Sequence, residues 1–538
     1  MSREIPSGDS IVQGRNLDRG FDETFDAIVV GSGAGGSPVA AYLAEAGWRV
    51  LILEEGPYYR PEEYGSFRAS EILRRMWREA GMFAAFGVGN TPVIGLAAGR
   101  CVGGSSVLTG GVCFRIPGVV HDEWVRERGL TELSEGAFEQ VYQEVERRVH
   151  VDEVPADMRA WPTRRLVAGA ESLGIRMRPT RRNTVGCEGN ARCNFGCPAQ
   201  AKQSVDVTFL PSALEHGARL VSDALVQRVL IENGRAVGVQ GRLLDPSTGK
   251  TSHKFVARAP IVVAACGTLH TPLLLMRSGL GRTSDALGSN VTLHPAVRMS
   301  AQFDEPLDGF SGSLQAVYSD HFASEGITIV GLHSPPNVLA AALPGIGAAH
   351  REIVRKMRGL SAMGGMVHDR GGGRVRPGPG REPILWYRMS PRDLQRLRRT
   401  ITILGEIAFA AGARALYPPV FGVRSIQSVG ELRRLEHEPI DARRIECIAF
   451  HPLGSARMSV SASEGVVSPT GETHEVQGLF VADGSVLPTS IGVNSQVPVM
   501  SMATRIGWII RDRFKPRSLP ARSRLARLLD NARWHLPI

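Results

Sequence analysis

Residues 25–36 read FDAIVVGSGAGG, and this stretch decides the fold. Its first half is a short apolar run, which predicts a buried strand. A helix is expected to follow Gly36 and to end at Gly47, because glycine is common just past helix C-termini. Residues 49–53 form a second apolar run and predict another buried strand, which ends at Glu54. Together these segments predict a β-α-β unit within about 30 residues.

The glycines of this unit follow the pattern G-x-G-x-x-G at Gly31, Gly33 and Gly36. The first glycine permits a tight turn, the second lets backbone approach a pyrophosphate, and the third lets the helix pack against the strand. The helix N-terminus offers unpaired N–H groups to phosphates. Glu54, about 20 residues later, is placed to hold a ribose hydroxyl. The pattern predicts a Rossmann-type dinucleotide site and leaves NAD and FAD as alternatives.

Length and composition exclude several classes of protein. A chain of 538 residues is too long for one hydrophobic core, and its 43% hydrophobic residues are typical of a globular protein. The net charge of +10 is not accompanied by a stripe of Lys/Arg and aromatic residues, so we expect no nucleic-acid partner. Arginines and leucines in the tail 515–538 predict either a solvated helix or a helix that contacts a membrane or a protein partner.

The N-terminus lacks the basic start and apolar core of a signal peptide, and no apolar run is long enough to span a membrane. We therefore expect a cytoplasmic protein, with membrane association through the tail as an alternative. In that setting the seven cysteines favour free thiols or a metal site over disulfides.

Other segments carry their own structural signals. Helices are expected at 136–149 and 163–173, hairpins between 221 and 256 with a turn at Asn233-Gly234, an apolar strand at 259–265, and irregular strands from 290 to 385. Ser390 and Pro391 are typical of a helix start, and that helix should end near Gly412. A last helix is expected to begin near Pro498.

Two further segments resemble a known family. RCVGGSS at 100–106 resembles the first signature of the glucose–methanol–choline (GMC) oxidoreductases, and CGTLHTPLLL at 266–275 resembles their second. The resemblance spans roughly residues 25–512 and is thinnest at 290–440. It implies an α/β fold with a discontinuous Rossmann-type FAD-binding domain and a second α+β substrate domain built on an antiparallel sheet. The motifs are most similar to the branch of cholesterol oxidase, pyranose oxidase and bacterial FAD-dependent glucose dehydrogenase.

The same resemblance implies a division of the chain. The expected parts are an N-terminal arm (1–24), an FAD-binding domain (25–115, 200–290 and 441–514), a substrate domain (116–199 and 291–440) that includes a Cys-rich segment (186–198), and a basic C-terminal tail (515–538).

FAD contacts beyond the glycine motif are also implied. The family places backbone like that of Gly103, Gly104 and Ser105 against the flavin and pyrophosphate, and holds adenine through backbone at the position of Val226. Backbone N–H groups of Asp483 and Gly484 are expected to contact the cofactor. Some relatives attach FAD to a histidine near the first signature, but residues 100–116 contain none, so noncovalent FAD is expected.

The catalytic residues are expected near the C-terminus, in FHPLG at 450–454, DGS at 483–485 and GVN at 492–494. The family places a histidine and then a His or Asn on the substrate side of the flavin, which implies His451 and Asn494. Hydride leaves an alcohol carbon for flavin N5 as the hydroxyl proton departs, and a neutral imidazole suits that proton. His451 is therefore the expected base, and Asn494 is expected to orient the substrate oxygen. His294 and His474 are expected to be structural.

Cys187, Cys193 and Cys197 form a C-x5-C-x3-C-P motif. Thiolates suit zinc or iron–sulfur clusters. The spacing resembles that of bacterial glucose dehydrogenases, which carry a [3Fe–4S] cluster, but other relatives have Cys/Gly-rich segments without one. Both alternatives stay open.

The sequence thus predicts FAD-dependent oxidation of an alcohol to an aldehyde or ketone, with oxygen, a quinone or a redox protein as the final electron acceptor. The alternatives are a non-redox FAD-containing lyase, an NAD-dependent dehydrogenase and a non-catalytic binding protein.

Overall fold

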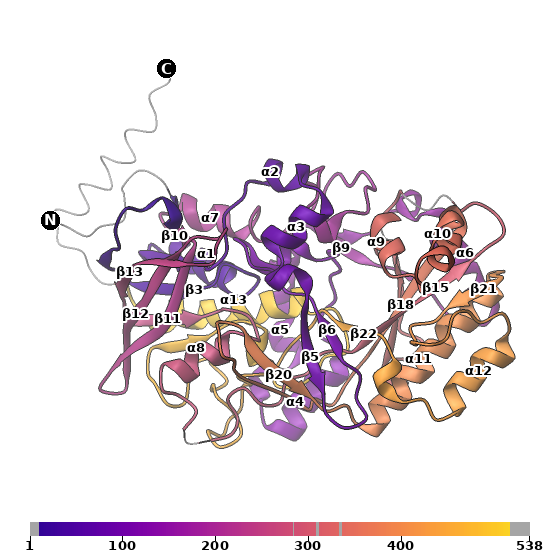
Figure 1. Ribbon diagram of the computed structural model, residues 1–538. Coiled ribbons are helices and arrows are strands. Elements are labelled where there is room, and N and C mark those ends of the chain that lie inside the picture. Colours follow the sequence, from indigo (N-terminus) through magenta and orange to yellow (C-terminus); the bar gives the residue numbers. More distant parts are fainter. Residues whose placement is uncertain (1–9, 283, 308–310, 333–335, 517–538) are drawn as a thin grey trace.

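The computed structural model describes residues 10–282, 284–307, 311–332 and 336–516 (Figure 1). One half of the molecule is organised around a six-stranded sheet in which every pair of neighbours is parallel. The strand order is β1 (Ile11–Gln13), β10 (Arg219–Ser222), β4 (Val50–Leu53), β3 (Ala27–Val30), β14 (Ile261–Ala264) and β23 (Leu479–Val481). All residues of β3, β4, β14 and β23 are buried, as expected for parallel strands covered on both faces.

Helices and a second sheet cover this parallel sheet. Helix α1 (Gly36–Glu45) packs against α7 (Phe209–Glu215) and α13 (Gln496–Arg513), and α13 packs against α5 (Glu135–Arg148). Next to β14 lies a four-stranded sheet of β11 (Ala224–Glu232), β12 (Arg235–Leu244), β13 (Thr251–Arg258) and β2 (Asp22–Thr24). The predicted turn between β11 and β12 is confirmed, because Asn233 and Gly234 both have positive φ angles.

The N-terminal segment differs from the loose arm expected at 1–24. Residues 11–13 add strand β1 to the edge of the parallel sheet, and residues 22–24 add strand β2 beside β13. Arg15 also forms an ion pair with the buried Asp223 at 2.8 Å. Hydrogen bonding to two sheets therefore fixes a segment whose polar composition gave no strand signal.

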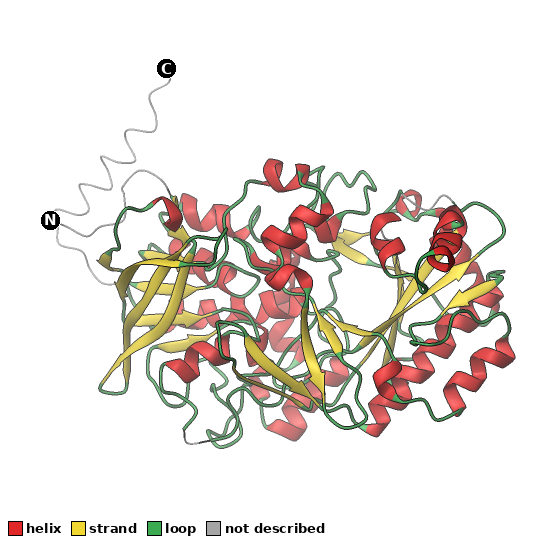
Figure 2. Ribbon diagram, viewed as in Figure 1, coloured by secondary structure: helices red, strands yellow, loops and turns green. Residues whose placement is uncertain are grey.

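The other half of the molecule is built on an eleven-stranded sheet, drawn in yellow across the centre and right of Figure 2. Its order is β19 (Gly373–Pro377), β20 (Pro383–Tyr387), β5 (Phe83–Gly87), β6 (Ile94–Leu96), β22 (Cys447–Ala449), β15 (Ala296–Gln302), β18 (Leu360–Val367), β17 (Ile327–Leu332), β16 (Val317–Ser319) and β8 (Arg178–Pro179), with β21 (Ala415–Tyr417) beside β15. Helix α11 (Pro391–Ala410) packs on β15 and β18 and against α6 (Trp161–Ser172) and α12 (Val429–His437).

The predicted helices are confirmed as α5, α6, α11 and α13. The Ser390 side chain caps α11 by accepting a hydrogen bond from the Asp393 N–H. Two short helices within 290–385, α9 (Pro336–Ala341) and α10 (Ala348–Arg355), were not expected. The remaining α-helices and strands in the described residues are α2 (Pro61–Ser66), α3 (Ala69–Met76), α4 (Gly118–Arg128), α8 (Thr271–Arg277), β7 (Val151–Glu153) and β9 (Arg181–Asn183), and short 3-10 helices occur between them. None of the described helices has the length and apolar character needed to cross a membrane.

Candidate functional site

The glycine loop between β3 and α1 has the geometry that its pattern predicts. Gly31 has φ +104°, and a Cβ there would lie 2.2 Å from the Ala265 carbonyl oxygen. A Cβ on Gly36 would lie 1.9 Å from the Gly31 carbonyl oxygen. The first glycine is therefore needed for the turn and for contact with β14, and the third for close approach of α1.

The start of α1 is left free to bind an anion. Its N-cap is Gly35, no side chain caps it, and its first turn contains no acidic residue. Across from this loop lies Gly104, whose Cβ would be only 3.0 Å from the Gly33 Cα. Two glycine backbones thus face each other at a helix N-terminus, which is an arrangement suited to phosphate groups.

Glu54 ends β4 and is nearly buried, at 8% exposure. Its carboxylate accepts hydrogen bonds from the Ser32 N–H (2.9 Å), the Ser32 hydroxyl (2.8 Å) and the Gly56 N–H (2.8 Å). Burial raises the pKa of Glu54, and this effect outweighs the three hydrogen bonds, which lower the pKa. The Ser32 hydroxyl oxygen also accepts from the Gly103 N–H at 3.1 Å, so one serine joins the glycine loop to the second glycine pair.

A cavity of about 620 Å³ connects these features with the eleven-stranded sheet. Of the residues predicted to bind cofactor or substrate, ten line it: Gly31, Gly33, Glu54, Gly104, Ser105, Val226, His451, Asp483, Gly484 and Asn494. Gly36 and Gly103 are not on the cavity wall and act by allowing close packing, since a Cβ on Gly103 would lie 2.6 Å from Val107.

Asp483 connects two chain segments through its side chain. One carboxylate oxygen accepts from the Gly267 N–H (2.8 Å) and the Thr271 hydroxyl, and the other accepts from the N–H and hydroxyl of Ser485. These bonds hold the segment after β14 against the segment after β23. The fixed carboxylate therefore shapes the cavity wall there.

His451 and Asn494 lie together on this wall. The Asn494 amide nitrogen donates to His451 Nε2 at 3.3 Å, and the Asn494 oxygen is buried without a hydrogen-bond partner among the described residues. Burial, followed by the neighbouring His294, lowers the pKa of His451 to about 3. The imidazole is consequently neutral at physiological pH, and the pair presents a proton acceptor and a polar amide to the cavity.

His294, expected to be structural, also lines the cavity. Its ring centroid is 5.4 Å from that of His451, and its Nε2 accepts from the N–H groups of Ile491 and Gly492, both at 3.1 Å. These bonds fix the loop that carries Asn494. His474 contacts the Ser459 carbonyl away from the cavity lining.

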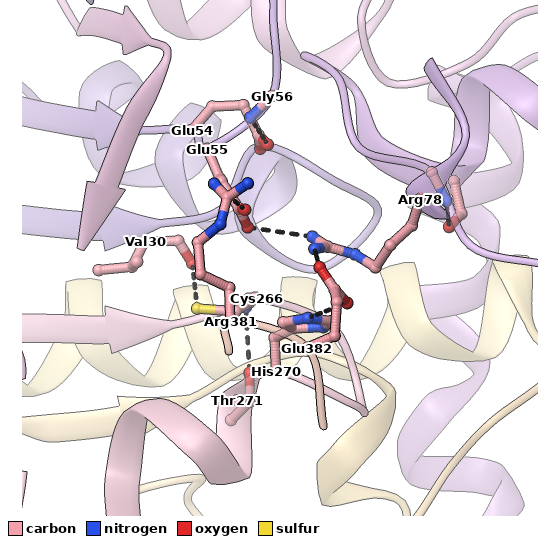
Figure 3. A network of polar contacts seen from close by, with 12 residues as sticks. Val30, Glu54, Glu55, Gly56, Arg78, Cys266, His270, Thr271, Arg381 and Glu382 are labelled. Carbon is pink, nitrogen blue, oxygen red and sulfur yellow. Dashed lines mark hydrogen bonds and ion pairs between the residues drawn. The ribbon is translucent and has the colours of Figure 1, made fainter. Parts of the chain in front are cut away.

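An ion-pair network closes one side of the cavity (Figure 3). Arg78 is 6% exposed and contacts Glu55 at 3.0 Å and Glu382 at 2.8 Å, while His270 contacts Glu382 at 3.1 Å and Arg381 contacts Glu55 at 3.5 Å. Burial raises the pKa of each glutamate, but the Arg78 and His270 charges and hydrogen bonds outweigh it and lower both to about 2. The guanidinium thus joins Glu55 to Glu382, and His270 and Arg381 extend the network through these two carboxylates.

Comparison with known proteins gives the family. The family model for the N-terminal part of GMC oxidoreductases matches residues 25–296, and the model for their C-terminal part matches 372–503. The chain belongs to the GMC oxidoreductase family. It is 36% identical over 483 residues to a GMC-type oxidoreductase of Mycobacterium tuberculosis (89% of this chain, 75% of that protein) and 29% identical over 528 residues to a long-chain-alcohol oxidase of Arabidopsis thaliana (90% and 67%).

Solved structures share the fold. The structure of pyridoxine 4-oxidase from Mesorbium loti superposes with a TM-score of 0.69 at 18% identity, covering 91% of this chain and 100% of that one. A formate oxidase from Aspergillus oryzae gives 0.71 at 17% identity, covering 92% and 99%. The predicted α/β architecture is therefore confirmed, and family membership makes the chain an oxidoreductase.

FAD, the cofactor of this fold, fits the residues on the wall. The paired glycine backbones and the uncapped start of α1 suit a pyrophosphate. Helix α13 likewise begins without a side-chain cap or an acidic first turn, directly after Asn494. Its N-terminus adds a partial positive charge at the end of the cavity that His451 and Asn494 line.

The three cysteines of the C-x5-C-x3-C-P motif are not gathered around one point in the described residues. Cys193 is buried and its sulfur accepts from Arg182 at 3.0 Å, whereas Cys187 and Cys197 are partly exposed. No group of three or more His, Cys, Asp or Glu side chains is placed to hold a metal ion within the described part of the chain. The structure thus gives no support to the iron–sulfur alternative, and the buried thiol of the motif contacts a guanidinium instead.

Proposed function

We propose that this GMC oxidoreductase oxidises an alcohol to an aldehyde or ketone, with His451 as the base. The observation that carries the proposal is the 3.3 Å contact between Asn494 and His451 on the wall of the cavity that also contains the glycine loop. A substrate hydroxyl placed between them would donate its hydrogen to His451 Nε2 and accept a hydrogen bond from Asn494. Proton removal by a positioned base contributes roughly 10²–10⁴-fold to rate.

The neutral state of His451 supports the role of base. Burial and His294 lower its pKa to about 3, so the ring is neutral at physiological pH, and Nε2, which accepts from Asn494 in this structure, can accept the hydrogen of a substrate hydroxyl instead. His294 fixes the 491–492 backbone and thereby the position of Asn494. FAD, when bound, supplies the two-electron acceptor for the hydride of the alcohol carbon.

Noncovalent FAD binding is part of the proposal. Gly31, Gly33 and Gly104 would contact the pyrophosphate, with Ser105 beside them, Glu54 the ribose, Val226 the adenine through backbone, and Asp483 and Gly484 the flavin end. The domain division predicted from sequence stays a proposal, with FAD held by 25–115, 200–290 and 441–514. It differs from the sheets at two places: α5 packs on α13 beside the parallel sheet, and β5, β6 and β22 belong to the eleven-stranded sheet. The tail contact with a membrane or partner concerns residues 515–538, of which 517–538 lie outside the described residues.

Anaerobic reduction tests the proposal. The purified yellow protein is mixed with a panel of primary and secondary alcohols without oxygen, and the visible flavin band is followed. Loss of the band with one of them is the expected result; no loss with any member, at high concentration, contradicts alcohol oxidation and favours the non-redox lyase. Readmission of air then identifies the acceptor class, since fast recolouring indicates oxygen and slow recolouring a quinone or redox protein.

A further inference from the structure

Strand β15 leads from the catalytic pair along the cavity wall to an arginine. His294 precedes the strand, and Ala296 and Arg298 follow at alternate positions, all three on the cavity lining. Ala296 and Arg298 share a face of the strand, whereas His294 lies before it with φ +50° and reaches the cavity from the preceding turn. Four residues span at most about 13 Å. Arg298 therefore lies on the same wall as His294, within the length of a small elongated molecule.

The Arg298 guanidinium is short of partners. One terminal nitrogen donates to the Ala342 carbonyl at 3.3 Å, and Nε is buried without a hydrogen-bond partner among the residues that the structure describes. No carboxylate lies within ion-pair distance of Arg298 in the described ranges, whereas the more deeply buried Arg78 has two. Burial lowers the pKa of Arg298, and Glu446, an exposed carboxylate that also lines the cavity, only partly offsets this.

The wall between the two ends is apolar. Besides Ala296, it consists of small or hydrophobic residues from neighbouring strands: Val330, Leu332, Gly364, Met366 and Ile448. A ligand along this wall would meet a polar pair at one end, an apolar middle and a positive charge at the other.

A partly buried cation without a counter-ion is costly, and an anionic ligand at Arg298 lowers that cost. Arginine also binds carboxylates with paired, charge-assisted hydrogen bonds. We propose that the substrate is a hydroxy acid with an apolar body, whose carboxylate binds Arg298 while its hydroxyl lies at His451. The apolar strands β17 and β18 cover the chain between them. This inference rests on the alcohol oxidation proposed above.

Paired substrates test this assignment in the FAD-loaded enzyme. Steady-state kcat/KM is measured for straight-chain ω-hydroxy carboxylates of increasing length and for primary alcohols of the same lengths. The wild-type enzyme should prefer the acid at one chain length. Arg298→Met should lower kcat/KM for that acid roughly 10- to 100-fold, the range of one charge-assisted hydrogen bond, and leave the matched alcohol nearly unchanged. Arg298→Lys should retain much of the preference.

A binding measurement provides an independent readout. Straight-chain carboxylates without a hydroxyl should inhibit the wild-type enzyme competitively, and their amides should inhibit far less; Arg298→Met should remove the difference. Arg414→Met is the matched control, because Arg414 forms a surface ion pair with Asp304 and does not line this cavity. Equal inhibition of the wild-type enzyme by carboxylate and amide would overturn the assignment even if Arg298→Met failed to fold.

The outcomes separate this inference from the proposed function. If alcohols bleach the flavin but the carboxylate brings no preference, the Arg298 assignment fails and alcohol oxidation stands. If neither series bleaches the flavin while carboxylates still bind through Arg298, alcohol oxidation fails instead.

Discussion

Removal of the Arg78 side chain should destabilise the protein more than any surface arginine would. In Arg78→Met the two carboxylates of Glu55 and Glu382 lose the guanidinium that contacts both, at 3.0 and 2.8 Å. Each pKa is lowered from 4.5 to about 2, and one pKa unit corresponds to about 1.4 kcal/mol. The two effects share one guanidinium and do not add, so we expect a loss of about 3–5 kcal/mol, as for other buried ion pairs deprived of one partner.

The assay is urea unfolding at neutral pH with FAD in excess, followed by fluorescence. The Arg78→Met midpoint should fall well below that of the wild type, and Arg414→Met should stay close to it, because the ion pair of Arg414 is exposed. A loss below about 1 kcal/mol would refute the reasoning, since it would mean that solvent or Arg381 replaces the guanidinium.

The same substitution should change the dependence of stability on pH. Lowered glutamate pKa values stabilise the folded state above about pH 4.5, and that contribution disappears as pH falls toward 2. In Arg78→Met the carboxylates lose the charge that lowers their pKa. The stability difference between wild type and variant should therefore shrink as pH falls through this range, and a constant difference would contradict the origin assigned to it.

Three further predictions concern the active site and the glycine loop. His451→Ala should lower turnover by roughly 10²-fold or more while the flavin spectrum of the purified protein is retained; near-normal turnover would exclude His451 as the base. Because the pKa of His451 is about 3, kcat/KM should stay level from about pH 8 to about pH 5, whereas a free imidazole would lose activity below about 6.5. Gly31→Ala should lose FAD and stability, because its Cβ would lie 2.2 Å from a carbonyl oxygen, whereas Gly47→Ala, with φ +82° and open space around it, should retain FAD with a smaller loss of stability.

The nucleotide-binding half was predictable because its signals are local. The strand, glycine loop, helix and Glu54 lie within residues 25–54, and each glycine has one packing reason that the pattern already states. The family signatures added the C-terminal segment, and the fold places His451 and Asn494 in contact, as the expected shared site requires.

The features that the sequence did not reveal depend on long-range contacts. Arg78 and Glu382 are 304 positions apart, so no spacing rule relates them. The alternation of Val297, Arg298 and Met299 indicates that the arginine faces away from the core. It does not reveal that this face borders a cavity. His294 offered one signal, its position directly before a strand, and only the fold brings it beside His451.

The order in which the parallel sheet is completed has a consequence for biosynthesis. Strand β23, which pairs with β14, is translated long after its neighbour, and it lies between the two segments that carry His451 and Asn494. Until the ribosome has released that region, the edge of β14 is unpaired and open to association with other chains. Cofactor capture should therefore be a late, post-translational event, and nascent chains that stall before residue 479 should depend on chaperones to stay dispersed.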